Sequence, residues 1–265
     1  MPQVDPSTSP ASSIRIAGRD IEYRRIASEG DAPTIVFLHE GLGSLGLWRD
    51  FPGALCARLG YGGIVYSRYG NGFSQALDAA RTAEYMHDEA RIALPELLDA
   101  LGLEKPLLFG HSDGASIALI FAGTFPERVS ALVLEAPHVV VEPLSLASIA
   151  KIREAYRVES LRERMRKHHA DVDRTFFGWN DVWLCDAFAS WNIAGFLEPI
   201  LAPALCIQGS DDEYGTVAQI DAIAAGSGGA VDRLILDRCG HAPHRDRAHY
   251  VRDATAAWIE NLSQR

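Results

Sequence analysis

The chain contains a serine whose neighbours could make it a nucleophile. Ser112 is the centre of a G-x-S-x-G sequence at residues 110–114. An apolar run at 106–109 predicts a buried strand, and the pattern at 115–125 predicts a helix packed on it. On such a turn the serine backbone is strained, and the two glycines let neighbouring segments approach without a Cβ clash. The hydroxyl would be exposed at the end of the strand, with the backbone N–H of Asp113 directed at the group under attack.

A serine hydroxyl is a weak nucleophile, so this hypothesis requires a base that is itself oriented by an acid. The expected order along the chain is Ser, Asp, His. Asp211 and Asp212 follow one late apolar run, and His241 follows the last one. On these residues alone, either aspartate could be the acid. His244 and His249 lie close to His241 in the sequence and are competing candidates for the base. The alternative is that the serine lies in a tight turn and has no chemical role.

Strand and helix patterns alternate along most of the chain, which predicts an α/β protein with a mostly parallel sheet covered by helices on both faces. Continuous apolar runs are typical of strands that are buried on both faces. The first two short runs predict an antiparallel hairpin. The expected strands are 13–17, 21–27, 34–39, 63–67, 106–109, 131–134, 204–208 and 231–236. The expected helices around them are 48–59, 82–101, 115–125, 217–225 and 248–262.

The strand pattern stops between residues 138 and 200, where only helical patterns remain. We interpret this stretch as a helical cap, or lid, inserted into a core domain. The expected organisation is a flexible tail at 1–12, a core domain at 13–137 and 201–265, and a cap at 138–200, with helices at 149–157, 160–169 and 179–191. Most aromatic side chains of the cap should pack its own small core, but a lid also needs an apolar underside. We expect Trp183 and Trp191 to face a substrate.

Composition limits the classes of partner. The formal net charge of -10 argues against nucleic acid and against an anionic membrane surface. The four cysteines form no C-x-x-C pair and no zinc-like cluster, and no nucleotide-binding G-x-G-x-x-G precedes a helix. We therefore expect no metal and no cofactor. Neither a signal peptide nor an apolar run of roughly 18 residues is present. The expectation is a cytoplasmic protein with a small-molecule substrate, and a homo-oligomer is left open.

Four motifs in order give the chain a resemblance to the α/β-hydrolase superfamily, from about residue 13 to residue 262. They are HEGLGS at 39–44, RYGNGFS at 68–74, GHSDG at 110–114 and GHAPH at 240–244. The resemblance implies an α/β-hydrolase fold with Ser112 as nucleophile. It implies Asp212, the fourth residue of a G-x-x-D turn, as the acid and His241 as the base. It also implies that the backbone N–H groups of Gly41 and Asp113 form the oxyanion hole.

Two acidic residues depart from the superfamily pattern. Glu40 stands where a glycine is usual, and Asp113 follows the nucleophile where an apolar residue is usual. A carboxylate facing the oxyanion hole would oppose developing negative charge. We expect Glu40 to turn away and bond backbone or an arginine such as Arg68. A Glu40 that faced the pocket would instead bind a polar or cationic substrate group, or position water.

These observations favour a serine hydrolase that cleaves a small or medium carboxylic ester, thioester or lactone through an acyl-enzyme. One alternative is hydrolysis of a carbon–carbon bond in a vinylogous diketone, which the resemblance also implies for members with helical lids. A second is a ligand receptor built on the same fold. Haloalkane dehalogenase and epoxide hydrolase chemistry is disfavoured, because the nucleophile of those enzymes is a carboxylate and not a serine.

Overall fold

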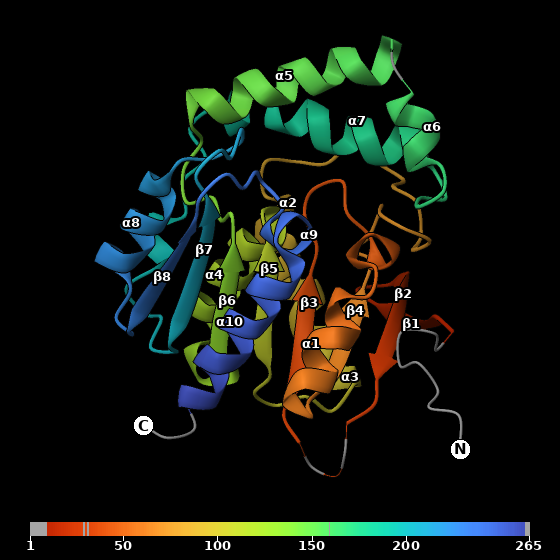
Figure 1. The fold of residues 1–265 in the computed structure, drawn as a ribbon. Coiled ribbons are helices and arrows are strands. Elements are labelled where there is room, and N and C mark those ends of the chain that lie inside the picture. Colours follow the sequence, from red (N-terminus) through yellow and green to blue (C-terminus); the bar gives the residue numbers. More distant parts are fainter. Residues whose placement is uncertain (1–9, 29, 31, 159, 263–265) are drawn as a thin grey trace.

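The computed structural model describes residues 10–262 except 29, 31 and 159, so most of the expected N-terminal tail lies outside the described residues. Its centre is an eight-stranded sheet with the order β1-β2-β4-β3-β5-β6-β7-β8 (Figure 1). β1 pairs antiparallel with β2 and β2 with β4, and all other neighbours are parallel. The strands are β1 (Ser12–Ile16), β2 (Arg19–Ile26), β3 (Thr34–Leu38), β4 (Gly62–Tyr66), β5 (Leu107–His111), β6 (Ala131–Glu135), β7 (Ala204–Gly209) and β8 (Val231–Leu236). The expected fold class and hairpin are therefore confirmed.

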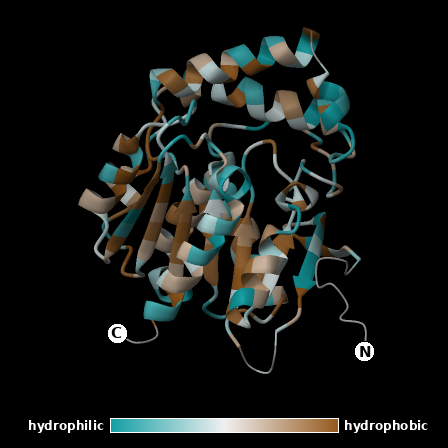
Figure 2. Cartoon of the chain, viewed as in Figure 1, coloured by the Kyte–Doolittle hydropathy of each residue, from teal (hydrophilic) through white to brown (hydrophobic). Residues whose placement is uncertain are grey.

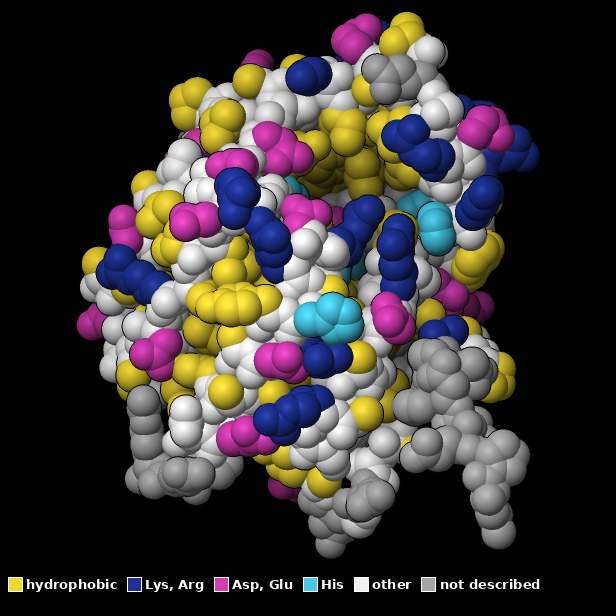
Figure 3. Space-filling view, in the orientation of Figure 1, with side chains coloured by type: hydrophobic (Ala, Val, Ile, Leu, Met, Phe, Trp, Pro, Cys, Tyr) yellow, Lys and Arg dark blue, Asp and Glu magenta, His cyan; other side chains and the backbone are white. Residues whose placement is uncertain are grey.

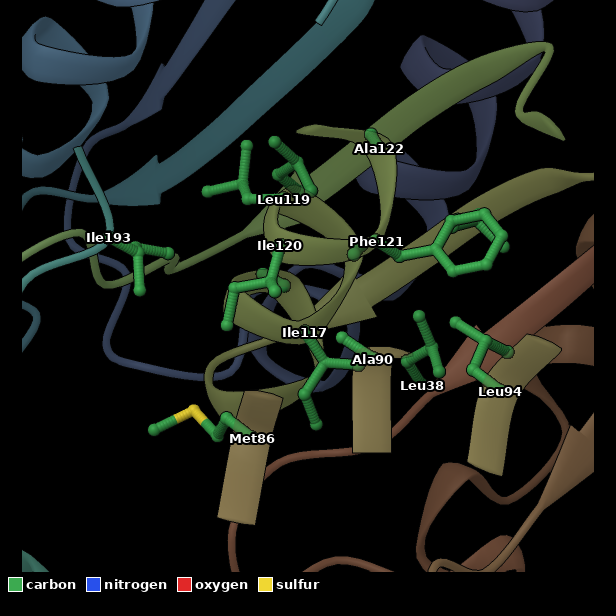
Figure 4. Close-up of a cluster of buried hydrophobic side chains, with 14 of the residues drawn as sticks. Leu38, Met86, Ala90, Leu94, Ile117, Leu119, Ile120, Phe121, Ala122 and Ile193 are labelled. Atoms are coloured by element: carbon green, nitrogen blue, oxygen red, sulfur yellow. The ribbon is translucent and has the colours of Figure 1, made fainter. Parts of the chain in front are cut away.

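Helices cover both faces of the sheet because its central strands are apolar on both sides. Every residue of β4, β5, β6 and β7 is buried. Along β3, Val36 and Leu38 belong to one hydrophobic cluster, while Ile35 and Phe37 belong to the other, as alternation along a strand requires. Figure 4 shows Leu38 and Ile117 of α4 among the side chains of the first cluster, and Figure 2 shows the apolar strands between the helical layers.

The helices of the core alternate with the parallel strands along the chain. The segment expected to be one helix over 82–101 contains a π-helical stretch, η3, between two α-helical parts, and a short 3-10 helix, η2, precedes α1. The core helices are η2 (Leu45–Trp48), α1 (Phe51–Leu59), α2 (Tyr85–Asp88), η3 (Glu89–Ala93), α3 (Leu94–Ala100), α4 (Asp113–Thr124), η4 (Pro126–Arg128), α8 (Val217–Gly226), α9 (Pro243–Asp246) and α10 (Ala248–Leu262). Among the described residues, no helix combines the length and the apolar character needed to cross a bilayer.

The segment between β6 and β7 contains helices and one isolated β-bridge, and it lies over the carboxyl ends of the parallel strands (Figure 1). Its helices are α5 (Pro143–Val158), α6 (Leu161–Met165), α7 (Val172–Trp183), η5 (Asp186–Phe188) and η6 (Ala194–Phe196). We refer to residues 138–200 as the helical insertion.

The structure gives other boundaries for all three helices expected in the insertion, and the helix expected at 160–169 is α6, which ends at Met165. The helix expected at 179–191 is α7, which begins at Val172 because the Asp171 side chain accepts the Arg174 N–H and caps it. It ends at Trp183, before Trp191. The helix expected at 149–157 begins earlier, since α5 has a proline at its first position. In both helices the apolar pattern begins several residues after the first residue of the helix, so the pattern alone misplaces the start.

Candidate active site

Ser112 lies on a sharp turn between β5 and α4, where its φ is 53° and its ψ is −119°. This is a strained conformation for a residue with a side chain, and such strain is typical of functional turns. The flanking glycines have a packing reason. A Cβ on Gly114 would overlap the carbonyl oxygen of Leu38, and a Cβ on Gly110 would lie 2.5 Å from the carbonyl oxygen of Gly114. The turn therefore requires glycine at both positions.

Three loops at the carboxyl ends of strands bring the predicted serine, histidine and aspartate together. The Oγ of Ser112 lies 2.9 Å from Nε2 of His241. The Nδ1 of His241 lies 2.9 Å from both carboxylate oxygens of Asp212. With Nδ1 protonated and donating to the carboxylate, Nε2 is free to accept the serine proton. The arrangement is thus able to activate a hydroxyl as a nucleophile.

The surroundings of Asp212 keep its carboxylate charged and fixed. It accepts hydrogen bonds from Nε2 of Gln208 at 2.7 Å and from the backbone N–H of Tyr214 at 2.7 Å. Burial alone would raise its pKa, but the hydrogen bond and charge of His241 outweigh burial and lower it. The neighbouring Asp211 is exposed and accepts from the hydroxyl of Ser210 instead. The structure therefore places Asp212, and not Asp211, against the histidine.

The two histidines that follow His241 in the sequence lie away from the serine. His244 is buried, and its Nδ1 lies 2.6 Å from an oxygen of Glu135 below the site. His249 lies in α10 and is exposed. Among the described residues, neither His244 nor His249 forms a hydrogen bond with the Ser112 hydroxyl. His241 is therefore the candidate base.

Gly41 and Asp113 line the same cavity as Ser112, as an oxyanion hole requires. Asp113 is the first residue of α4, so its N–H has no acceptor one turn earlier in the helix, and the helix N-terminus favours negative charge there. The Nδ2 of Asn71 donates to the carbonyl oxygens of Gly41 and Gly43, at 3.0 Å each. Asn71 thereby holds the turn that follows β3.

The side chains of the two unusual acids are paired with neighbouring side chains, and both residues line the cavity at Ser112. The Oε2 of Glu40 lies 3.4 Å from Nδ1 of His111, and Glu40 remains 22% exposed at the cavity wall. Burial would raise the pKa of Glu40, but His111 outweighs it and holds that pKa far below its ordinary value. The Nη2 of Arg68 donates to the Glu40 carbonyl oxygen at 2.8 Å, so the expected side-chain bond to Arg68 is not found. The carboxylate of Asp113 is buried and accepts from the hydroxyl of Tyr85 at 2.5 Å.

The cavity at the triad has a volume of about 350 Å³ and is bounded by the helical insertion. Figure 3 shows a hollow lined by hydrophobic side chains beneath α5 and α7. The apolar part of its lining is Leu42, Ile149, Ile152, Trp179, Trp183 and Tyr214. Trp183 therefore reaches the cavity as expected. Trp191 does not line it; it is stacked on Phe188, with ring centroids 5.3 Å apart, inside the insertion.

Trp179 and His138 are two of the cavity residues that were not singled out from the sequence. Trp179 lies one turn before Trp183 on the same face of α7, and this i, i+4 spacing was the available signal. Its Nε1 has no hydrogen-bond partner among the described residues. His138 follows β6 and lies with its ring centroid 5.9 Å from that of His241. Burial and the nearby His241 lower the pKa of His138 to about 3, so it is neutral at pH 7. No group of metal-ligating side chains occurs in the part of the chain that the structure describes.

Comparison with known proteins gives one family. A family model described as "alpha/beta hydrolase fold" matches residues 33–178. A 2-hydroxy-6-oxo-6-phenylhexa-2,4-dienoate hydrolase of Comamonas testosteroni is 26% identical over an alignment of 248 residues, and the match covers 84% of this chain and 85% of that protein. A proline iminopeptidase of Saccharolobus solfataricus is 25% identical over an alignment of 243 residues, and the match covers 75% of this chain and 76% of that protein.

Solved structures with this fold include enzymes of several kinds. The enol-lactonase from Burkholderia xenovorans LB400 superposes with a TM-score of 0.72 and 20% identity, covering 94% of this chain and 100% of the other. A hydrolase from Pseudomonas aeruginosa PA01 superposes with a TM-score of 0.75 and 20% identity, covering 95% of this chain and 99% of the other. At these identities the likeness concerns the fold and not the substrate.

Proposed function

The chain belongs to the α/β-hydrolase family and its relatives include hydrolases, and from this premise we propose that it is a serine hydrolase acting through an acyl-enzyme. The proposed substrate is a small or medium carboxylic ester, thioester or lactone. The observation that carries the proposal is the continuous chain of hydrogen bonds from Ser112 through His241 to Asp212.

The proposed reaction has two steps. The Oγ of Ser112 attacks the substrate carbonyl carbon while Nε2 of His241 takes the hydroxyl proton, and Asp212 stabilises the imidazolium. The N–H groups of Gly41 and Asp113 bind the oxyanion. His241 then gives its proton to the leaving alcohol, thiol or enol. In the second step His241 takes a proton from water, and the water oxygen attacks the acyl carbon; the bond to Oγ then breaks, His241 returns the proton to Ser112, and the acid is released.

The shape and charge of the cavity support the proposed substrate class. A volume of about 350 Å³ fits a small or medium acyl group, and the indoles of Trp179 and Trp183 offer it apolar walls. The Glu40 carboxylate stands beside the oxyanion turn, so an anionic group on the substrate would be repelled there. We propose that the helical insertion is the lid over this cavity, with Trp179 and Trp183 of α7 as its underside.

A second candidate is hydrolysis of a carbon–carbon bond in a vinylogous diketone. It is favoured by the Comamonas testosteroni relative, which is named a dienoate hydrolase and is matched over most of both chains. Such a substrate carries a carboxylate. Among the cavity residues, Arg245 is exposed, and its guanidinium is able to pair with that group.

The first test is the intact mass of the protein after exposure to a fluorophosphonate probe, for the native chain and for Ser112→Ala. The expected result is one adduct on the native chain and none on the variant. Esters, lactones and vinylogous diketones are then screened, and the substrate that turns over separates the two candidates. Labelling of Ser112 without turnover of any of them would favour a ligand receptor. A folded native chain that gives no adduct contradicts the proposed mechanism.

We also propose that the protein works in a reducing compartment, as the cytoplasmic location expected from the sequence implies. All four cysteines lie in the described part of the chain and all are free thiols. Free thiols are the state that a reducing compartment maintains.

A further inference from the structure

A second cavity, of about 410 Å³, lies between the antiparallel edge of the sheet and the segment that runs from β4 to α3. Its lining includes Tyr66, Arg68, Leu77, Arg81, Tyr85 and Glu89. None of its lining residues is shared with the cavity at Ser112. The proposed hydrolase mechanism makes no use of it.

Two arginines at this cavity have guanidinium nitrogens without hydrogen-bond partners. Arg68 is only 2% exposed, and its Nη2 donates to the carbonyl oxygens of His39 and Glu40. The Nε and Nη1 of Arg68 have no partner among the described residues, and neither does the Nε of Arg81. Buried donors of a charged group without acceptors are costly, so a native structure that keeps them calls for an acceptor from outside the chain.

The acidic groups around the two arginines do not supply those acceptors. Glu89 lines the same cavity, and its carboxylate accepts from the hydroxyl of Tyr66 at 2.7 Å. Asp113 lies behind the wall, 3.9 Å from the Nη2 of Arg68, and is bonded to Tyr85. Asp78 and Asp88 also line the cavity, but both are exposed to solvent. The Nε and Nη1 of Arg68 and the Nε of Arg81 thus have no acceptor among the described residues, although the charge of Glu89 acts on both arginines.

From this geometry we propose that the second cavity binds a small organic carboxylate with an apolar body, such as an aromatic acid. A carboxylate offers two charged acceptor oxygens in the plane that a guanidinium prefers. The apolar walls come from residues such as Ile21, Leu77 and Leu97, next to the ring of Tyr85. These surfaces would hold an aryl or branched alkyl group, whereas an inorganic anion would leave them empty.

A ligand in the second cavity would contact groups that support the active site. The hydroxyl of Tyr85 donates to the Asp113 carboxylate and accepts from Nε1 of Trp183 at 3.0 Å. Arg68 in turn holds the carbonyl oxygen of Glu40, next to Gly41. Occupancy of one cavity should therefore change affinity at the other, and the effect must be reciprocal. This coupling rests on the proposed function, whereas binding of the carboxylate does not.

The test is calorimetric titration of the full chain with benzoate. The expected result is saturable binding, with benzamide, the neutral amide of the same shape, at least tenfold weaker because it lacks the charge. Arg81→Gln should weaken benzoate binding about tenfold or more, since it removes a charged donor. Arg91→Gln is the matched control, because Arg91 is exposed on η3 and does not line the cavity; it should change the affinity less than twofold.

Two further measurements keep the proposal falsifiable. Ala93 lines the cavity, so Ala93→Leu should reduce binding by filling space without any change of charge, even if Arg81→Gln perturbs its loop. Benzoate binding should also persist after the fluorophosphonate has blocked Ser112. Binding that is lost on that block and is unchanged in Arg81→Gln and Ala93→Leu would place benzoate in the active site and overturn the proposal. Equal binding of benzamide, unchanged binding in both variants, or no binding at millimolar benzoate would overturn it as well.

Discussion

Asp211 and Asp212 are adjacent carboxylates whose surroundings predict different roles. Asp212 is bonded to His241, whereas Asp211 is exposed and bonded to a serine hydroxyl. We predict that Asp212→Asn lowers kcat by about 10⁴-fold, because an amide stabilises the wrong histidine tautomer. Asp211→Asn should stay within about twofold, as is usual for a surface change. Steady-state turnover of the best ester from the screen measures both. A comparable loss in the two variants would contradict the assignment.

Glu40, which is 22% exposed, and the buried His111 form a pair whose contribution to stability depends on pH. Burial opposes ionisation of Glu40, but His111 lowers its pKa below the ordinary 4.5, so its stabilising effect is lost as the pH falls. Burial also opposes protonation of His111, but Glu40 raises its pKa above the ordinary 6.5. The effect of His111 is therefore full below 6.5 and is lost as the pH rises through the raised value. The pair contributes most between these limits.

We accordingly predict that Glu40→Gln lowers the free energy of unfolding by about 1–3 kcal/mol at pH 6 and by less at pH 9. Urea unfolding at both pH values measures the difference. Glu84→Gln is a matched control, since Glu84 pairs with His87 at 3.2 Å but is 67% exposed. That variant should lose less than about 1 kcal/mol at either pH. A loss for Glu40→Gln that does not depend on pH would show that the His111 charge is not involved.

At the scale of elements, the turn after β3 and helix α7 are packed against each other at Gly41. A Cβ there would overlap the indole of Trp179. We predict that Gly41→Ala pushes α7 outward and lowers kcat/KM at least tenfold, with a loss of stability of about 1–3 kcal/mol from overpacking. Adding Trp179→Ala should restore much of the stability lost in Gly41→Ala, because it removes the clash.

Kinetics and urea unfolding of the two single variants and the double variant form a cycle that measures this coupling. Gly195→Ala is the control, because nothing lies within 4 Å of a Cβ at that position. Strict additivity of Gly41→Ala and Trp179→Ala would mean that the two elements are not coupled through this contact.

The same elements show what could be predicted from the sequence. All eight expected strands are present with ends within two residues of the expected positions, because buried parallel strands have continuous apolar runs. The end of α7 could not be predicted in this way. Trp183, Phe188 and Trp191 pack on one another in space, so their apolar spacing imitates a longer helix although α7 ends at Trp183. Tertiary packing, and not local periodicity, decides that boundary.

The candidate site divides along similar lines. The order of the motifs along the chain predicted the contact of Ser112 with His241. The carboxyl ends of parallel strands lie at the same edge of the sheet whatever the loop sequences are. The partner of Glu40 was not anticipated. His111 belongs to the serine motif, and its side chain reaches Glu40 only because β3 and β5 are neighbours in the sheet. The spacing of residues along the sequence does not predict the strand order that makes β3 and β5 neighbours. The catalytic roles themselves stay predictions.

On the scale of the whole molecule, the helical insertion is bonded to the core at several points that involve the segment after β4. The hydroxyl of Thr175 donates to the carbonyl oxygen of Gly70 at 2.7 Å. The backbone N–H of Gly72 donates to Nδ1 of His169 at 3.0 Å, which is able to accept because burial lowers the pKa of His169 to about 4. Trp183 donates to Tyr85 of α2. These bonds indicate that the insertion does not unfold independently of the sheet.

We therefore predict a single cooperative unfolding transition for the whole chain. Three of the five tryptophans (Trp179, Trp183 and Trp191) lie in the insertion, so tryptophan fluorescence reports mainly on that part, while far-UV circular dichroism reports on the whole. The two urea midpoints should coincide. His169→Ala removes the acceptor for Gly72 and should lower the free energy of unfolding by about 1–3 kcal/mol, moving both midpoints together. His249→Ala, at an exposed position, should move neither. A fluorescence midpoint well below the dichroism midpoint would instead mean that the insertion opens by itself, and the lid would then be a mobile element and not a fixed wall of the cavity.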